Sequence, residues 1–116
     1  MKKILLIGGT ATNRALLKAS LEEAGHRVTT AITHKYTNSW LAHRIKPFDL
    51  IIHDTEEVER DETFWKELRE AAGATPILVL TSAFDATNYV ALGMNHALHR
   101  PYTIGNVVTA ANELLA

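Results

Sequence analysis

Residues 3–32 read KILLIGGTATNRALLKASLEEAGHRVTTAI, and three elements follow one another in this stretch without a linker. Lys3 to Ile7 is an apolar run without alternating polarity, which predicts a strand buried on both faces. Thr10 to Ala24 has apolar residues at helical spacing and is followed by Gly25, a residue type that often ends helices. Arg27 to Ile32 predicts a second strand. The residues expected to face the core from the helix are Leu16, Leu17, Leu21 and Ala24.

The rest of the chain continues the same alternation of strands and helices. Further strands are expected at Asp49–His53, Ile77–Leu80 and Ala97–His99. Further helices are expected at Tyr36–Lys46, after an N-cap at Asp61, at Ala86–Leu92, and after a cap at Thr103. Five strand–helix units in strict order predict a parallel sheet covered by helices on both faces. We therefore expect one α/β domain of three layers over residues 1–116.

Composition narrows the classes of function. The chain has 116 residues, 47% hydrophobic and 22% charged, and a formal net charge of −1, so it has no electrostatic reason to bind nucleic acid or an anionic membrane. It contains no cysteine, which excludes disulfides and thiol nucleophiles. No apolar run approaches the roughly 20 residues that span a bilayer. We expect a cytoplasmic protein that is not an enzyme, because no serine–histidine or cysteine–histidine arrangement is supported by the spacing.

The working site of such a sheet lies at the carboxyl ends of its strands. The residues at these ends are Gly8, Gly9, Asp54, Thr81 and Arg100. The six histidines match no zinc-binding spacing, and no metal site is expected from them.

Four stretches carry a resemblance to the receiver domains of response regulators. They are ILLIGGTATNR (4–14), PFDLIIHD (47–54), LTSA (80–83) and GMNHALHRPY (93–102), in order and at the family's intervals. The resemblance covers essentially the whole chain. It implies a flavodoxin-like, doubly wound (βα)5 fold and a role in signal transduction. It also implies that Asp54 stands at the phosphoacceptor position and that a cis peptide bond precedes Pro101.

The sequence departs from the family first at its metal site. Where receiver domains carry two acids that hold Mg²⁺, this chain has Gly8 and Gly9, which supply no side-chain oxygen. Asp54 would bind the ion almost alone, helped at most by Glu56 or Glu57. We therefore expect Mg²⁺ binding to be weak or absent and no cofactor to be required.

Three further departures affect the phosphorylation machinery. Arg100 replaces the family's lysine, and its planar fork suits a direct ion pair with Asp54. Ala97 replaces the aromatic residue that moves in the family when the residue at the Thr81 position engages the phosphoryl group. The loop after Asp54 carries three glutamates, which would repel added negative charge. The pattern favours a phosphorylation-independent protein-interaction module.

Two other functions stay open. One is a conventional phosphoacceptor receiver that uses Asp54 and a histidine kinase. The other, more remote, is a Rossmann-like domain that binds a nucleotide or small anion at Gly8, Gly9 and Thr10, although the later glycines of the dinucleotide pattern are missing.

The C-terminal part of the sequence is poor in charge. From Pro76 to the end, the only charged residues are Asp85, Arg100 and Glu113. Because interface cores are depleted in charge, this predicts a surface for a protein partner, an output domain or a second copy, formed by the fourth helix, fifth strand and fifth helix. Its candidate residues are Tyr89, Ala97, Asn106, Thr109, Ala110 and Glu113.

Overall fold

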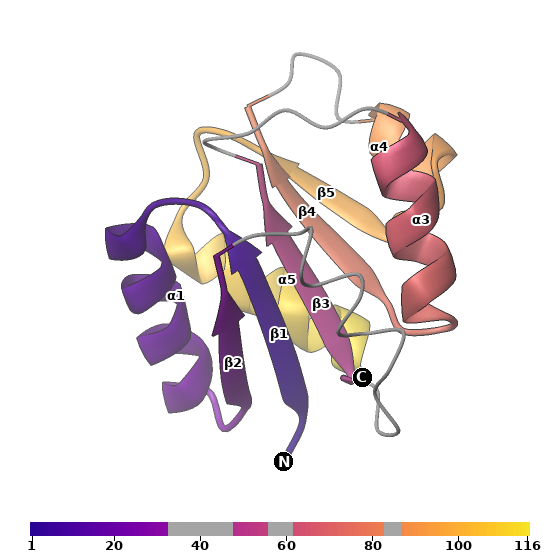
Figure 1. Ribbon diagram of the computed structural model, residues 1–116. Helices are drawn as coiled ribbons and strands as arrows, with labels where there is room; N and C mark the ends of the chain where they lie inside the picture. Colours follow the sequence, from indigo (N-terminus) through magenta and orange to yellow (C-terminus); the bar gives the residue numbers. More distant parts are fainter. Residues whose placement is uncertain (33–47, 56–61, 83–86) are drawn as a thin grey trace.

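The computed structural model describes residues 1–32, 48–55, 62–82 and 87–116. In these residues, five strands form one parallel sheet in the order β2-β1-β3-β4-β5 (Figure 1). The predicted flavodoxin-like architecture is confirmed, although the helix expected at Tyr36–Lys46 and the N-cap expected at Asp61 lie outside the described residues. The strands are β1 (Lys3–Gly8), β2 (Arg27–Ala31), β3 (Leu50–Asp54), β4 (Ile77–Thr81) and β5 (His96–His99). The helices are α1 (Ala11–Glu23), α3 (Glu62–Ala72), α4 (Thr87–Ala91) and α5 (Ile104–Leu115).

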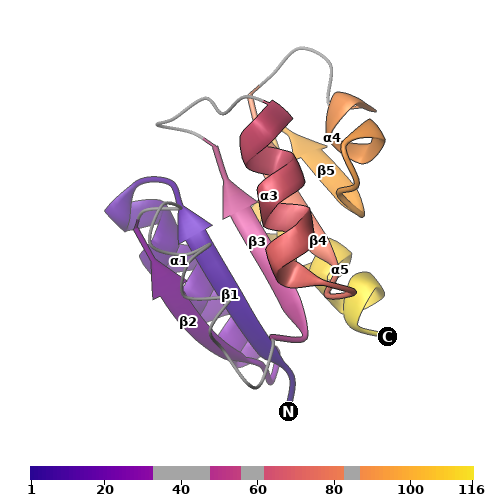
Figure 2. The ribbon, with the colours of Figure 1, turned by 45° about the vertical axis from the view of Figure 1, so that its right-hand side comes forward.

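The central strands of the sheet pack against helices on both faces, as predicted from their apolar runs, in which polar and apolar residues do not alternate. In β1, Ile4 and Leu6 face a core with α1 and α5, whereas Leu5 and Ile7 face a core with α3. Figures 1 and 2 show α1 and α5 on one face of the sheet and α3 and α4 on the other. The predicted strand bounds differ from the observed ones by one residue at one or both ends.

The predicted core face of α1 is wrong at two positions. Leu17 and Leu21 are buried, but Leu16 is 48% exposed, because it lies about 100° around the helix from Leu17. Ala24 is exposed, because it is the C-cap residue, where α1 has already ended. Trp65 of α3 is only 1% exposed.

Arg69 of α3 fixes the turn that leads into β5. Its guanidinium donates to the carbonyl oxygens of Gly93, Gly73 and Thr75 and to Oδ1 of Asn95. Burial lowers the pKa of Arg69 from its ordinary value. These bonds join the end of α3 to the turn before β5, and β5 in turn positions Arg100.

The helices α1 and α5, which cover one face of the sheet, both begin after a threonine N-cap. Thr103 accepts a hydrogen bond from the backbone N–H of Asn106, whose side chain accepts one from the N–H of Thr103. This capping box confirms the predicted start of α5. Thr10 is the N-cap of α1, and its side chain accepts a hydrogen bond from the backbone N–H of Asn13. None of the described helices is long and apolar enough to cross a membrane.

Candidate functional site

Asp54 is the last residue of β3, at the edge of the sheet where the sequence places the site. The parallel register sets Gly8 of β1 beside Asp54 and Leu80 of β4 on its other side. The side chain of Asp54 is only 1% exposed. A carboxylate this deeply buried needs a compensating charge or hydrogen bonds.

Arg100 supplies that charge. Its Nη2 donates to Oδ1 of Asp54 in an ion pair, and its Nη1 lies 3.2 Å from Oγ of Ser82. The guanidinium carbon also lies 5.2 Å from the centroid of the Tyr102 ring, and the side chain is 19% exposed. The direct pairing of Arg100 with Asp54, predicted from the sequence, is confirmed. The peptide bond between Arg100 and Pro101 is cis, as the resemblance implies.

Gly8 and Gly9 shape the site through their backbone conformation. Both have positive φ, 78° and 75°, a conformation that L side chains rarely adopt. A Cβ atom at Gly9 would lie 2.6 Å from Oδ2 of Asp54 and 2.9 Å from its Cγ. A Cβ atom at Gly8 would overlap the carbonyl oxygen of Asp54. The end of β1 therefore lies so close to Asp54 that only glycine fits without a shift.

Arg14 of α1 contributes to the site in a way that its sequence position does not reveal. Its Nη1 donates to the carbonyl oxygen of Gly8 at 3.2 Å and to that of Gly9. These bonds hold the turn between β1 and α1. Thr10 occupies the N–H of Asn13, an amide that a bound anion would use, and the carboxylate of Asp54 lies beside Gly9. This geometry does not favour the nucleotide or anion site.

The described residues do not fit a Mg²⁺ site of the kind that receiver domains carry. Mg²⁺ requires several oxygen ligands in a near-octahedral arrangement. Among Gly8, Gly9, Asp54, Thr81 and Arg100, only Asp54 offers a carboxylate, and Arg100 already engages it. Residues 1–32, 48–55, 62–82 and 87–116 contain no cluster of three histidine or acidic side chains placed to hold a metal. Glu56 lies outside the described residues.

Thr81 ends β4 and contacts an aromatic residue from another element. Its Oγ1 lies 3.2 Å from the hydroxyl of Tyr89 in α4, and the side chain of Thr81 is buried. The Tyr89 ring packs edge-on against Trp65, with 5.1 Å between centroids. Ala97, which stands where receiver domains carry an aromatic residue, packs against the core cluster that contains Trp65. The sequence predicted Tyr89 only as a surface residue and did not predict its contact with Thr81.

His53, next to Asp54 in β3, lies in the same cluster. It is buried and packs edge-on against Phe64 and Trp65, with centroids 5.4 Å and 5.1 Å apart. Sequence reasoning did not distinguish His53 from the other histidines, because a histidine inside an apolar strand has no pattern of its own. Two neighbouring residues of β3 thus have different roles: Asp54 forms the ion pair with Arg100, and His53 belongs to the aromatic cluster.

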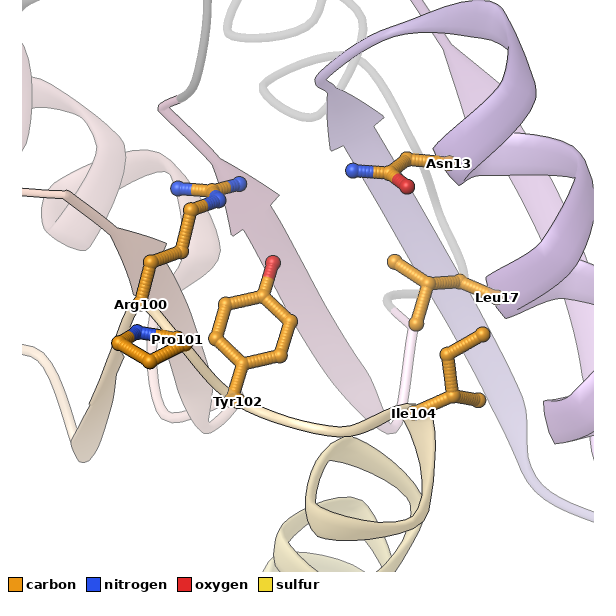
Figure 3. A pocket seen from close by; sticks show the side chains of 6 residues that line it. All are labelled: Asn13, Leu17, Arg100, Pro101, Tyr102 and Ile104. Carbon is orange, nitrogen blue, oxygen red and sulfur yellow. The ribbon is translucent and has the colours of Figure 1, made fainter.

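An open groove of about 470 Å³ runs between α1 and the segment that joins β5 to α5. Figure 3 shows the polar ends of Asn13, Tyr102 and Arg100 pointing toward the same space, above Leu17 and Ile104. Arg100 therefore forms part of the groove wall as well as of the pair with Asp54.

Comparisons with known proteins agree with this fold. No family model and no curated protein matches the sequence. Among solved structures, the chemotaxis response regulator CheY4 of Vibrio cholerae is similar at 25% identity and TM-score 0.81, over 99% of both chains. The Francisella response regulator 1452 receiver domain has 20% identity and TM-score 0.85, over 99% of this chain and 97% of that one.

A third similar structure is the receiver domain of the sensor histidine kinase PA1611 from Pseudomonas aeruginosa, with a magnesium ion coordinated in its active-site cleft. It has 23% identity and TM-score 0.79, over 98% of this chain and 97% of that one. The chain has the flavodoxin-like fold of response-regulator receiver domains.

Proposed function

We propose that this chain is a receiver-type signalling module that acts by binding protein partners and does not depend on phosphorylation of Asp54. The observation that carries the proposal is the state of the Asp54 carboxylate. It is buried, it is held in an ion pair by Arg100, and the backbone of Gly9 lies against it. An incoming phosphoryl group would have to displace Arg100 and would meet no metal held by the described residues.

The physical reason lies in what phosphoryl transfer requires. Catalysis of this reaction comes almost entirely from positioning and from neutralising charge on the phosphoryl oxygens, usually with Mg²⁺. Gly8 and Gly9 contribute no ligand, and the positive charge of Arg100 is already used to neutralise Asp54. The geometry therefore supports a closed site with a structural function, and we assign the chain no catalytic activity.

The alternative, a conventional phosphoacceptor receiver served by a histidine kinase, retains one supporting observation. Asp54 and Thr81 still stand at the ends of neighbouring strands, the positions that the family uses. The two functions differ in whether Asp54 reacts.

Amide NMR spectra with Mg²⁺ and then beryllofluoride, which imitates a phosphoryl group on aspartate, test the proposal. At millimolar concentrations we expect the signals of Asp54, Thr81 and Arg100 to stay in place, because the pair excludes both the ion and the mimic. A receiver domain with an intact acid pair, treated in parallel, shows that the reagent is active. Shifts at these residues that vanish in Asp54→Asn would establish a working phosphoacceptor and refute the proposal.

The surface proposed for the partner is formed by α4, β5 and α5. Val90 of α4 is 53% exposed, and Asn106, Thr109 and Glu113 of α5 are exposed. β5 is an edge strand of the described sheet, so one side of its backbone is not covered by a neighbouring strand there. Few charges and an exposed valine favour a protein partner, an output domain or a second copy on this face.

One predicted interface residue is wrong. Ala110 is only 6% exposed and belongs to the core cluster that α5 forms with α1 and the sheet. The helical period turns Ala110 inward together with Val107 and Ala111. A charged residue at Ala110 would therefore disturb folding and would report nothing about the interface. Ala97 is half-buried against the other core cluster.

The surface is tested with Val90→Asp and Thr109→Asp, because both side chains are exposed. Each is expected to weaken self-association about tenfold, or about 1.4 kcal/mol, by placing an unpaired charge in an interface. Sedimentation equilibrium measures the dissociation constant. Lys66→Glu, at an exposed position on α3, is the matched control and should leave it unchanged. Equal dissociation constants for all three variants and the parent would exclude this face as a contact between copies.

A further inference from the structure

The groove between α1 and the segment that joins β5 to α5 has a polar end and an apolar end. Its volume of about 470 Å³ is in the range of sites for small molecules. Figure 3 shows the polar side-chain ends of Asn13, Tyr102 and Arg100 at one end of this space. Leu17 and Ile104 line the other end. A ligand that fits both ends therefore carries a polar group at one end of an apolar body.

The apolar part of the groove is a slot with one aromatic wall. The Tyr102 ring lies on one side of it, and Leu17 and Ile104 lie on the other (Figure 3). Leu17 is only 3% exposed and belongs to the core, and Tyr102 and Ile104 pack against the same core cluster. The core therefore holds both walls in place, and a flat ring system fits between an aromatic ring and two aliphatic side chains.

Arg100 determines the charge of the polar end. Of the six described residues that line the groove, Arg100 alone is charged. Its side chain is 19% exposed, whereas that of its partner Asp54 is 1% exposed, so a molecule in the groove meets the cation and not the carboxylate. A guanidinium presents its N–H donors in a planar fork that matches the two oxygens of a carboxylate. The charge and the donors together favour an organic anion.

We propose that this groove binds a small planar organic acid, with its rings in the slot beside Tyr102 and its carboxylate at Arg100 and Asn13. The guanidinium is shared with Asp54, which already neutralises part of its charge, so the affinity is modest. The site is separate from the turn at Gly8 and Gly9, where the geometry does not favour an anion. The proposal goes beyond the proposed function and does not rest on it, because binding in the groove requires neither a silent Asp54 nor a protein partner.

Amide NMR titration of the whole chain with 2-naphthoate tests the site. For a ligand of this size we expect a dissociation constant on the order of 1 mM and saturable shifts at Asn13, Leu17, Tyr102 and Ile104. 2-Naphthalenemethanol has the same rings and a neutral hydroxymethyl group, and it should bind at least about fivefold more weakly. No saturable shifts at these residues, or equal affinities for the acid and the alcohol, would overturn the proposal.

Two variants of the ion pair test whether Arg100 recognises the carboxylate. Asp54→Asn removes the competing charge, so 2-naphthoate should bind about tenfold more tightly, whereas binding of the alcohol should not change. Adding Arg100→Ala to Asp54→Asn should remove this gain and weaken the binding of the acid below that of the parent. The double variant leaves no buried carboxylate and therefore serves where Arg100→Ala alone does not fold. An affinity for the acid that is the same in Asp54→Asn and in the double variant would refute the role of Arg100.

Two neighbouring positions of α1 test the location of the acid. Asn13→Ala removes the side-chain amide from the groove but keeps the backbone N–H that Thr10 caps, and it should weaken 2-naphthoate about threefold. Thr12→Ala is the matched control, because Thr12 is exposed and is not among the described residues that line the groove. Its affinity should equal that of the parent. Equal affinities in the two variants would place the acid elsewhere and refute the site.

The titration is independent of the beryllofluoride experiment. A reactive Asp54 would refute the proposed function and leave binding in the groove unaffected, whereas a silent Asp54 with no binding of 2-naphthoate would refute the groove site alone.

Discussion

Replacing Arg100 with alanine is expected to lower the free energy of unfolding by about 3 kcal/mol. The side chain of Asp54 is 1% exposed, and its ionised form would lose the positive charge that compensates its burial. Two such charges at about 4 Å attract by about 4 kcal/mol at an effective dielectric of 20, and desolvation offsets part of this when the pair forms. Urea denaturation followed by circular dichroism measures the loss.

Two further variants test whether the loss of stability comes from a buried carboxylate that has no compensating charge. Adding Asp54→Asn to Arg100→Ala should recover much of the stability, because no buried carboxylate then remains. Arg100→Lys should cost less than alanine, since it keeps the charge but not the fork that reaches both Asp54 and Ser82. A loss below about 1 kcal/mol in Arg100→Ala would place the pair among weak surface pairs and remove the main support for a closed site.

The fold and the position of the site were predictable from the sequence for one physical reason. In a parallel sheet all the strands end at the same edge, so residues that follow separate apolar runs must come together. This placed Asp54, Thr81 and Arg100 side by side, and the chemistry of a guanidinium and a carboxylate then predicted their pairing. The pairing of Arg100 with Asp54 could be predicted from the charge and length of the two side chains alone.

The wrong predictions concern helical residues for which a shift of one position along the sequence changes the side chain from buried to exposed. Leu16 and Leu17 are equally apolar, and only packing against the sheet selects Leu17 for the core. Ala110 is small and lies in a polar stretch, so composition placed it outside, whereas α5 turns it inward. Arg14 bonds two carbonyl oxygens, and Tyr89 contacts Thr81 through its hydroxyl. These contacts depend on where the side chains point, and they leave no pattern in the sequence.

The glycines at the end of β1 give the other large expected effect. Gly9→Asp, which introduces one of the two acids that receiver domains carry at the end of this strand, is expected to destabilise the protein by about 4 kcal/mol. Positive φ alone costs a side chain about 1–2 kcal/mol. The Cβ atom would also lie 2.6 Å from Oδ2 of Asp54, and a second carboxylate would add like-charge repulsion. Urea denaturation measures the sum.

A second glycine separates these contributions. Gly73 also has positive φ, at 62°, but a Cβ atom there would meet nothing within 4 Å. Gly73→Ala should therefore lower the free energy of unfolding by about 1 kcal/mol, the contribution of the positive φ alone. Gly9→Ala should lower the free energy of unfolding by about 3 kcal/mol. The difference between the losses in Gly9→Ala and Gly73→Ala measures the steric overlap of the new Cβ atom with Asp54. Equal losses in the two alanine variants would mean that Asp54 moves aside freely, and the site would then be open to refilling.

Magnesium tests whether the metal site that receiver domains carry can be built into this chain. A ligand present at 100 times its dissociation constant stabilises a folded protein by about 2.7 kcal/mol. If the two glycines were simple omissions, Gly8→Asp combined with Gly9→Asp would rebuild the site, and millimolar Mg²⁺ would restore much of the lost stability. We expect no such rescue, because both new side chains would have to occupy space that Asp54 fills and Arg100 would still hold its carboxylate. Stabilisation of the double variant by more than about 1 kcal/mol would show that the close approach of β1 to Asp54 yields to a metal, and that the closed pair is one of two accessible states of the site.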